Sequence, residues 1–273
     1  MRVAVVGHVE WIEFAAVERL PHAGEIVHAR ESWEVPGGGG GVAAVPLARL
    51  AGECLLITAL ADDELGRRSK RELEALGVRV EVAWRQGPQR RAFVHVDGGG
   101  ERTITVIGER SGAHGADSLP WHELGGADAV YMTAGDADAV RAARRARTLV
   151  ATARAKETLA EAAVELDALV SSSGDAGEQY TAGSIAPEPR LVARTAGSSG
   201  GTALTAEGAE IIWQPEPPPG PVLDTYGAGD CFAAGLTFGL ASGPVEEALR
   251  LGARCGADCV TRRGPYERPP AHS

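Results

Sequence analysis

The chain lacks the features that mark secreted, membrane-spanning and nucleic-acid-binding proteins. Its four cysteines have no paired metal-ligand spacing, so we interpret them as small apolar residues in a reducing compartment. The formal net charge is −10, which argues against nucleic acid or an anionic membrane as the main partner but leaves room for a local phosphate site. No basic region precedes a long apolar stretch at the start. We therefore expect neither a signal peptide nor a membrane span, and predict a cytoplasmic protein.

Large side chains are also scarce. The 273 residues include 36 glycines but only 5 Trp, 4 Tyr, 4 Phe and 2 Met. Alanine and valine must therefore supply much of the packing. The length is sufficient for one large domain, or a domain with an appendage.

Strand and helix patterns alternate along most of the chain. Strands are expected at 2–6, 54–60, 78–84, 129–132, 148–152, 168–171 and 190–195, and helices at 42–50, 64–76, 137–147, 156–164, 229–241 and 244–260. Short apolar runs of this kind are typical of buried parallel strands. The alternation predicts a three-layer α/β fold around a mainly parallel sheet.

Two stretches interrupt this alternation. Residues 9–35 contain no convincing helix cap, and residues 90–107 have the pattern of two strands, 91–96 and 101–106, around the turn 97–100. Together they are expected to form a small sheet that projects from the main body. A sheet connected near glycines is a candidate lid.

The segment 224–230 is the most informative part of the sequence. It reads Asp-Thr-Tyr-Gly-Ala-Gly-Asp and leads into an apolar run, 231–236, which predicts a glycine turn entering a helix. The first amides of a helix have no internal acceptor and can receive a phosphate. A carboxylate there would repel a phosphate, unless Asp230 takes a proton from a hydroxyl that attacks phosphorus. An anion-binding turn beside a general base is the least that a small-molecule kinase requires of its active site.

Five segments, in this order, resemble the ribokinase (PfkB) family of carbohydrate and nucleoside kinases. They are the glycines 38–41 before a helix-like stretch, Leu-Ala-Asp-Asp-Glu-Leu-Gly at 60–66, Gly-Glu-Arg-Thr at 100–103, Thr-Ala-Gly-Ser-Ser-Gly at 195–200 and the loop 224–230. The resemblance spans about residues 2 to 265. It implies a ribokinase-like fold with a central, mostly parallel sheet and a small β-sheet lid. The main domain would comprise 1–8, 36–88 and 109–273, and the lid 9–35 and 89–108.

The resemblance also implies roles for residues. Asp230 would be the catalytic base, with an anion hole formed by the amides of Gly227, Ala228 and Gly229. Further residues carried over as nucleotide-binding are Thr195, Gly197, Gly200, Asp175 and Thr225. ATP and Mg²⁺ are implied as cofactors, with Asp175 near Mg²⁺ through water. Asp224 lies where members often hold a monovalent cation such as K⁺. Lid sheets of this family often pair across a homodimer.

The expected acceptor site departs from the family pattern. The Asn of the glycine signature is Ala43 here, and an Asp that often binds two sugar hydroxyls falls near Ile12. The N-x-x-E motif falls on Ser172-Ser173-Gly174-Asp175, which loses its Asn. These departures argue against ribose itself as the acceptor. The candidate substrate-binding residues are Glu10, Trp11, Glu13, Gly38, Gly39, Ala43 and Arg102.

The sequence thus predicts an ATP-dependent kinase that phosphorylates a hydroxyl of a sugar, sugar derivative or nucleoside. The altered segment 172–175 motivates an alternative, a nucleotide- or sugar-binding regulatory protein that kept the fold and lost efficient chemistry. A kinase for a vitamin precursor such as a hydroxymethylpyrimidine is a third hypothesis, but relatives of that kind generally lack a two-segment lid.

Overall fold

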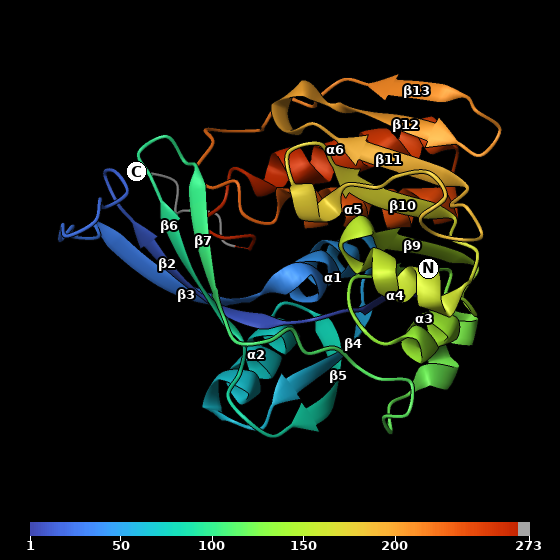
Figure 1. Cartoon of the computed structure of the whole chain (residues 1–273), viewed down its shortest axis with the longest axis horizontal. Coiled ribbons are helices and arrows are strands. Elements are labelled where there is room, and N and C mark those ends of the chain that lie inside the picture. Colours follow the sequence, from blue (N-terminus) through green and yellow to red (C-terminus); the bar gives the residue numbers. More distant parts are fainter. Residues whose placement is uncertain (267–273) are drawn as a thin grey trace.

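The computed structural model describes residues 1–266 and contains one large sheet and one small one (Figure 1). The large sheet has nine strands in the order β13-β12-β11-β10-β9-β8-β1-β4-β5. The strands are β1 (Val3–Val6), β4 (Cys54–Ala61), β5 (Val78–Arg85), β8 (Ala129–Met132), β9 (Thr148–Thr152), β10 (Ala168–Ser172), β11 (Leu191–Thr195), β12 (Gly201–Thr205) and β13 (Glu210–Trp213). All pairs from β11 to β5 are parallel, and β12 and β13 pair antiparallel. The predicted mainly parallel sheet is confirmed.

Helices cover both faces of this sheet and make three layers. The helices α1 (Gly38–Ala51), α2 (Glu64–Ala75), α5 (Ala228–Ser242) and α6 (Val245–Cys259) pack in one apolar core, and α3 (Ala137–Ala143), α4 (Lys156–Ala162) and the 3₁₀ turn η1 (Trp121–Gly126) pack in the other. The strand β1 shows why: Val3 and Val5 belong to the first core, and Ala4 and Val6 to the second. Successive strand side chains point to opposite faces, so a fully apolar strand needs helices on both.

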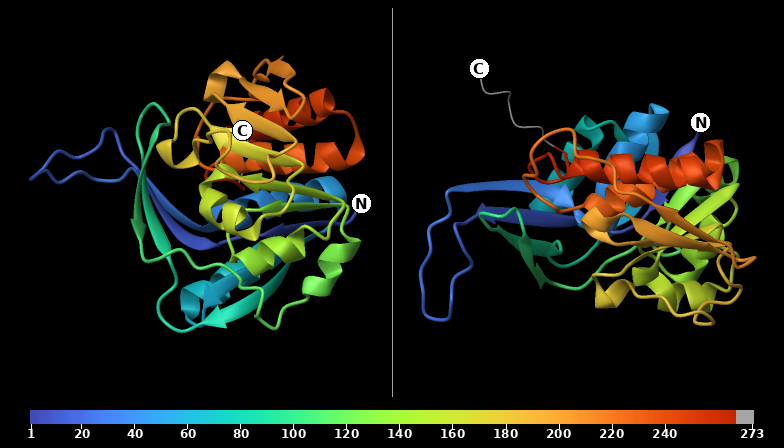
Figure 2. Two further views of the ribbon diagram at one scale, coloured as in Figure 1. Left: turned by 45° about the vertical axis from the view of Figure 1, so that its right-hand side comes forward. Right: turned by 90° about the horizontal axis from the view of Figure 1, so that it is seen from above.

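The second sheet combines the two stretches that interrupt the alternation. Its order is β3-β2-β6-β7, from β2 (Glu10–Ala16), β3 (Glu31–Gly37), β6 (Arg91–Val96) and β7 (Arg102–Ile107). The predicted hairpin is present as the antiparallel pair β6–β7, and β2 joins it by pairing parallel to β6. Figures 1 and 2 show this sheet projecting beside the large one. The ring of Phe14 anchors the small sheet to the main body. Its centroid lies 4.9 Å from that of Trp33, on which it stacks, and 5.4 Å from that of Tyr226, which it meets edge-on.

Three predictions about elements need correction or extension. The strands β12 and β13 were not predicted, and neither were the separate strands β2 and β3 within 9–35. The helix predicted over 137–147 ends at Ala143, because the chain must turn there to enter β9; the amide of Arg147 already donates to the carbonyl of Ala127. The last residues of the predicted main domain, 267–273, lie outside the described residues.

Candidate active site

The loop 224–230 forms the predicted turn into a helix. Gly227 adopts φ = +80°, a left-handed conformation that favours glycine, and α5 begins at the next residue. Asp224 is buried and braces the loop, since its two carboxylate oxygens accept the amides of Tyr226 at 2.8 Å and Gly264 at 3.0 Å. Within residues 1–266, the amides of Gly227, Gly229 and Asp230 have no acceptor, while that of Ala228 lies 3.4 Å from the carbonyl of Thr225. The helix therefore begins with donors available to an anion.

The Asp230 carboxylate lies in the first turn of α5 and is partly buried. Burial and the carboxylate of Glu178 raise its pKa to about 7, although three arginines (Arg154, Arg102 and Arg110) act in the opposite direction. An acid whose pKa lies near neutrality can both take and return a proton there. The surroundings of Asp230 thus suit acid–base chemistry.

A second glycine-led helix meets Asp230. A Cβ on Gly39 of α1 would lie 3.0 Å from Oδ1 of Asp230, so the two helix starts are in contact. Gly38 has φ = +77°, and a Cβ on Gly40 would lie 2.7 Å from the backbone of Gly7. The fifth glycine, Gly41, has only ordinary contacts at 3.5 Å or more. Turn geometry and close backbone approach therefore explain most of the glycine run.

Two buried polar atoms without partners lie along Gly39. Nδ1 of His8 and the hydroxyl of Thr133 make no hydrogen bond among the described residues. The same Cβ position on Gly39 is 3.4 Å from the His8 ring and 3.5 Å from Cβ of Thr133. Burial lowers the pKa of His8 well below its usual range, and nearby Arg110, Arg90 and Arg154 lower it further, so the ring is neutral at pH 7. Unsatisfied buried groups are uncommon and often mark functional sites.

These residues stand at one edge of the large sheet. His8 follows β1, Thr133 follows β8, and Arg154 follows β9. Asp175 and Glu178 follow β10, and the turn 196–200 follows β11. Ligands of open α/β sheets bind outside the carboxyl ends of parallel strands, which is this edge.

Four arginines surround the edge, and three have partners. Arg90 donates to Glu10 at 2.7 Å, and Arg102 of β7 donates to the carbonyl and hydroxyl of Thr225 at 2.9 and 2.7 Å. Arg154 binds two carboxylates, at 2.5 Å (Asp175) and 2.9 Å (Glu178). Arg110 makes no hydrogen bond or ion pair with any of residues 1–266. Arg102 thus links the small sheet to the loop 224–230, and its guanidinium is already engaged by the protein.

The structure separates the predicted acceptor residues into two groups. Gly39 lies beside Asp230, and Gly38 packs against His8 and the backbone of Glu10. Buried Glu10 acts on the pKa of both Tyr226 and Arg110, which places it near the site. Three others do not face the site. They are Trp11, Glu13 and Ala43.

The physical reasons for these corrections are local. Trp11 is 1% exposed, and the Arg68 guanidinium of α2 covers its ring at 4.3 Å. Glu13, two residues on, pairs with Arg91 within the small sheet. Ala43 is fully buried in the core of α1 and has no polar atom to offer. Period-two alternation in β2 puts Trp11 and Glu13 on the face opposite to Glu10.

Four of the predicted nucleotide residues lie at or just after the ends of β10 and β11: Thr195, Gly197, Gly200 and Asp175. The fifth, Thr225, lies in the loop before α5 and accepts hydrogen bonds from Arg102. The hydroxyl of Thr195 donates to the carbonyl of Ser171 at 3.3 Å, and the amide of Ala196 donates to the carbonyl of Gly200 at 2.9 Å. Gly197 begins the 3₁₀ turn η4 (Gly197–Ser199). Asp175 caps the turn η3 (Ala176–Glu178) by accepting the amide of Gly177 at 2.8 Å.

Several residues of the candidate site had no predicted role. Glu178 has the clearest signal, because it lies three residues after Asp175 and so offers an acidic pair with the spacing of the N-x-x-E motif. His8, Thr133, Arg110 and Arg154 carry no such local signal. Within residues 1–266 no group of three or more His, Cys, Asp or Glu side chains could hold a metal ion. None of the helices described there is long and apolar enough to cross a membrane.

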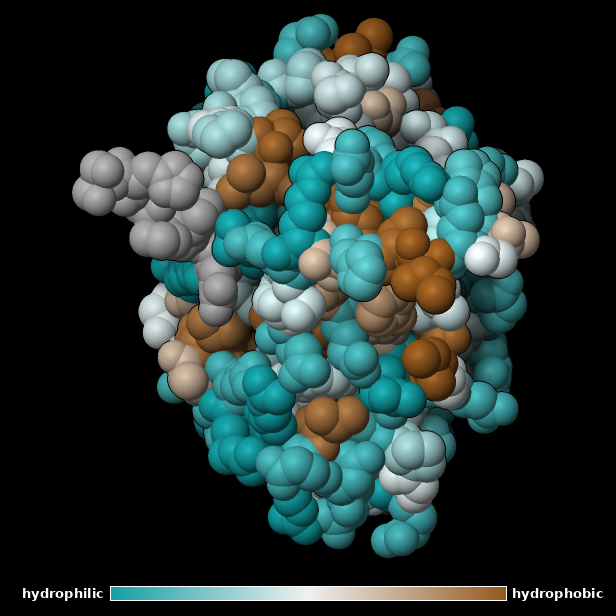
Figure 3. All heavy atoms as spheres, turned by 90° about the vertical axis from the view of Figure 1, so that its left-hand side faces the viewer, coloured by the Kyte–Doolittle hydropathy of each residue, from teal (hydrophilic) through white to brown (hydrophobic). Residues whose placement is uncertain are grey.

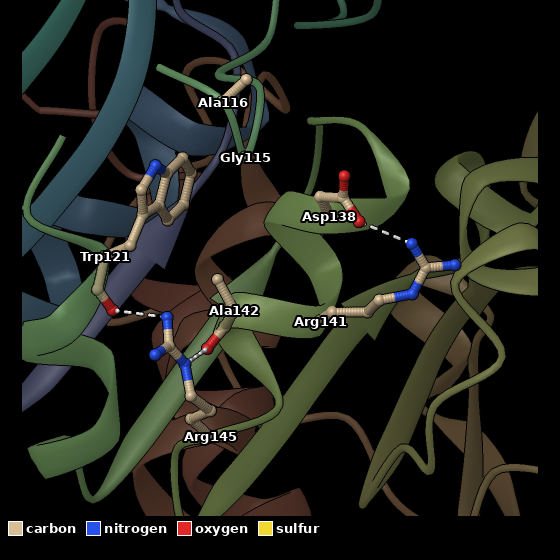
Figure 4. Close-up of a pocket in the computed structure, with 7 residues that line it drawn as sticks. All are labelled: Gly115, Ala116, Trp121, Asp138, Arg141, Ala142 and Arg145. Carbon is tan, nitrogen blue, oxygen red and sulfur yellow. Dashed lines mark hydrogen bonds and ion pairs between the residues drawn. The ribbon is translucent and has the colours of Figure 1, made fainter. Parts of the chain in front are cut away.

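Two of the hollows on the surface of residues 1–266 bear on the location of the site. One of about 200 Å³ borders the site and is lined by Arg110, Thr133 and Arg154, with Asp136 and Glu157 on its wall. A larger one, of about 430 Å³, is lined by Trp121, Arg141 and Arg145 (Figure 4). It lies between η1 and α3, on the face of the sheet opposite to α5, so its size does not make it the site of the chemistry.

Comparisons with known proteins agree with this geometry. The model of the pfkB family carbohydrate kinases matches residues 1–272. An ATP-dependent ribose-1-phosphate kinase from Halopiger xanaduensis is 30% identical, covering 99% of this chain and 96% of that protein.

Solved structures share the fold at lower identity. Thermotoga maritima ribokinase has a TM-score of 0.75 at 21% identity, covering 97% of this chain and 94% of its own. Arabidopsis thaliana ribokinase, complexed with ribose and ATP, has a TM-score of 0.74 at 21% identity, covering 96% and 93%. The predicted ribokinase-like fold is confirmed. The chain belongs to the pfkB family of carbohydrate kinases and is a phosphotransferase with an alcohol group as acceptor.

Proposed function

We propose that Asp230 is the general base of an ATP-dependent kinase acting on a sugar, sugar derivative or nucleoside. The observation that carries the proposal is the position of this carboxylate, in the first turn of α5, with a pKa raised to about 7, beside amides without acceptors. The acceptor hydroxyl oxygen attacks the γ-phosphorus of ATP, its proton passes to Asp230, and ADP leaves. A positioned base contributes about 10²–10⁴-fold in rate.

The amides of Gly227, Ala228 and Gly229 form the proposed anion hole. Their donors are fixed before reaction, so they stabilise negative charge on the transferring group without reorganisation. Each well-aimed donor is worth about 2.7–4 kcal/mol in the transition state. The weak 3.4 Å contact of the Ala228 amide to Thr225 costs little to replace.

ATP would lie along the ends of β10 and β11, where Thr195, Gly197 and Gly200 shape the edge and Thr225 supports the loop. Asp175 and Glu178 fit Mg²⁺ as oxygen donors, but both already bind Arg154, so they would act on the ion through water. When bound, Mg²⁺ would neutralise charge on the polyphosphate. Both carboxylate oxygens of Asp224 accept backbone amides, so Asp224 would hold the loop that borders a K⁺ site and not bind the ion itself.

The small sheet would serve as the lid, from segments 9–35 and 89–108, over a main domain of the remaining residues. The contact of Arg102 with Thr225 supports closure of the small sheet onto the loop 224–230. Closure would exclude water and limit wasteful ATP hydrolysis. The strand β7 exposes Ile104, Val106 and Ile107, and Figure 3 shows apolar patches on the side of the molecule that carries this sheet. These exposed apolar side chains of β7 support a homodimer through the lid.

The test is ADP release with ATP, Mg²⁺ and a panel of sugars, sugar phosphates and nucleosides. Asp230→Asn should lower kcat by at least about 100-fold with every acceptor used, because no base remains, while ATP affinity stays close to normal. Asp138→Asn, which changes an exposed carboxylate of α3, is the matched control and should be fully active. Tight ligand binding without turnover by the wild type would instead favour the regulatory protein, and a fully active Asp230→Asn would refute the base.

A further inference from the structure

Arg110 is the cation near Asp230 that has no protein partner. It is partly buried and makes no hydrogen bond or ion pair within residues 1–266, whereas Arg90, Arg102 and Arg154 all do. A guanidinium offers five N–H donors in a fixed fork. No protein atom within residues 1–266 uses these donors, so an anionic ligand could accept hydrogen bonds from them.

The charges around Arg110 point in the same direction. Burial lowers its pKa, and the nearby Arg154 and Arg90 lower it further, while Glu10 and Asp230 oppose the shift. The carboxylates nearest to the other two arginines are already used in ion pairs. An incoming anion would therefore relieve repulsion among cations without displacing a protein partner.

The hollow beside Arg110 gives such an anion room. Arg110, Arg154 and Thr133 line its volume of about 200 Å³. The two acidic residues of the hollow do not occupy its cationic side. Asp136 caps α3 by accepting the amides of Ala139 and Gly115, and Glu157 is exposed to solvent.

The hollow is next to the reacting centre. Gly39 packs against both, because a Cβ on Gly39 would lie 3.0 Å from Oδ1 of Asp230 and 3.5 Å from Cβ of Thr133, and Thr133 lines the hollow. Arg110 also follows β7 in the chain. Two residues before it, a Cβ on Gly108 would lie 3.7 Å from Cα of Arg90, which precedes β6. Arg110 thus stands at the base of the lid, and the hollow that it shares with Arg154 lies next to the β10–β11 edge proposed for ATP.

We propose that the acceptor is a phosphorylated sugar, whose phosphate ester binds Arg110 while a different hydroxyl of the same molecule gives its proton to Asp230. This inference rests on the proposed function. The forked donors of arginine match the oxygens of phosphate. The ester itself is neither formed nor broken: the γ-phosphoryl group of ATP is added at the second position, and the products are a sugar bisphosphate and ADP.

The experiment compares ribose with ribose 1-phosphate as acceptors, which differ only in the anionic group. The wild type should use the phosphorylated sugar at least about tenfold better in kcat/KM, as hydrogen bonds to charged groups imply. Arg110→Gln should raise KM for ribose 1-phosphate by about ten- to hundredfold and leave the KM for ATP unchanged. Arg110→Lys should recover part of the loss, since it restores the charge but not the fork.

Controls separate this inference from the proposed function. Arg141→Gln, in the unrelated hollow of Figure 4, should change neither KM. Inorganic phosphate should compete with the acceptor in the wild type and lose that effect in Arg110→Gln, which keeps the test open if the variant enzyme is poorly active. Three results would overturn the inference. They are equal kcat/KM for ribose and ribose 1-phosphate, a preference for a sugar carboxylate over the sugar phosphate, and a change in Arg110→Gln of the KM for ATP alone. ADP release with neutral acceptors only would refute it and leave the kinase intact, whereas no ADP with any acceptor would refute the kinase.

Discussion

Two helices that begin with glycines meet at the site, and they use their first amides differently. At α1, protein atoms take the amides: Gly38 donates to the hydroxyl of Tyr226 at 3.0 Å, and Gly40 donates to the carbonyl of His8 at 3.0 Å. At α5, the amides of Gly227 and Gly229 have no acceptor in the described chain. A glycine-rich helix start is therefore not an anion site by itself. The same residue type permits tight packing in α1 and leaves donors open in α5.

Alanine at Gly40 should have the largest effect and should act on stability. The new Cβ would lie 2.7–2.9 Å from backbone atoms of Gly7 and His8, which cannot move away as a flexible side chain could. We expect Gly40→Ala to lower the free energy of unfolding by about 1–3 kcal/mol. Gly41→Ala is the control, because its Cβ meets nothing closer than 3.5 Å. Chemical denaturation of both variants measures the difference, and equal stabilities would contradict close packing in α1.

Alanine at Gly229 should show the opposite pattern. Its Cβ meets no protein atom within 4 Å, so stability should be unchanged or rise by up to about 1 kcal/mol from helix propensity. Activity should nevertheless fall by about tenfold or more, because the methyl group would stand beside the open amides where the phosphoryl group must approach. Thermal unfolding and kcat/KM for ATP measure the two effects. A variant with normal activity would mean that phosphate does not approach this turn.

Glutamine at Arg102 should have the smallest effect. The change removes the hydrogen bonds from the lid to Thr225, which are at the surface and worth little each. We expect acceptor KM to rise by about threefold and the ratio of ATP hydrolysis to transfer to increase, since the closed lid would be less stable. Arg91→Gln on the neighbouring strand, which loses only the ion pair to Glu13, should leave both unchanged. Identical kinetics in the two variants would argue against a lid contact at Thr225.

Local patterns in the sequence were sufficient for most of the fold and for the glycine turn that leads into α5. The alternation of apolar runs with amphipathic segments predicted the parallel strands, and the hairpin 91–106 was predicted from its turn. The strands β12 and β13 were missed because both are short and partly exposed, and Ile212 points to solvent. Asp230 and its glycines are consecutive in the chain, so their arrangement follows from local geometry.

The proposed acceptor half of the candidate site depends on contacts between distant residues. His8, Thr133 and Arg110 come from the end of β1, the end of β8 and the segment after β7, and only the sheet order brings them together. Trp11 illustrates the same limit. Its position in the sequence suggested a sugar contact, but the alternation of β2 and the Arg68 guanidinium bury it on the other face.

The pH dependence of acceptor kcat/KM tests the role of Asp230 most directly. A base must be ionised to accept a proton, so a pKa of about 7 predicts that kcat/KM rises about tenfold per pH unit below that value and levels off above it. Ordinary Asp ionises near pH 4, so without the raised pKa no such rise would occur in this range. The account predicts a half-maximal rate near pH 7 in the wild type and no such inflection in the residual activity of Asp230→Asn. A wild-type profile that stays flat from pH 5.5 to 8.5, or an inflection that survives in the variant, would contradict it.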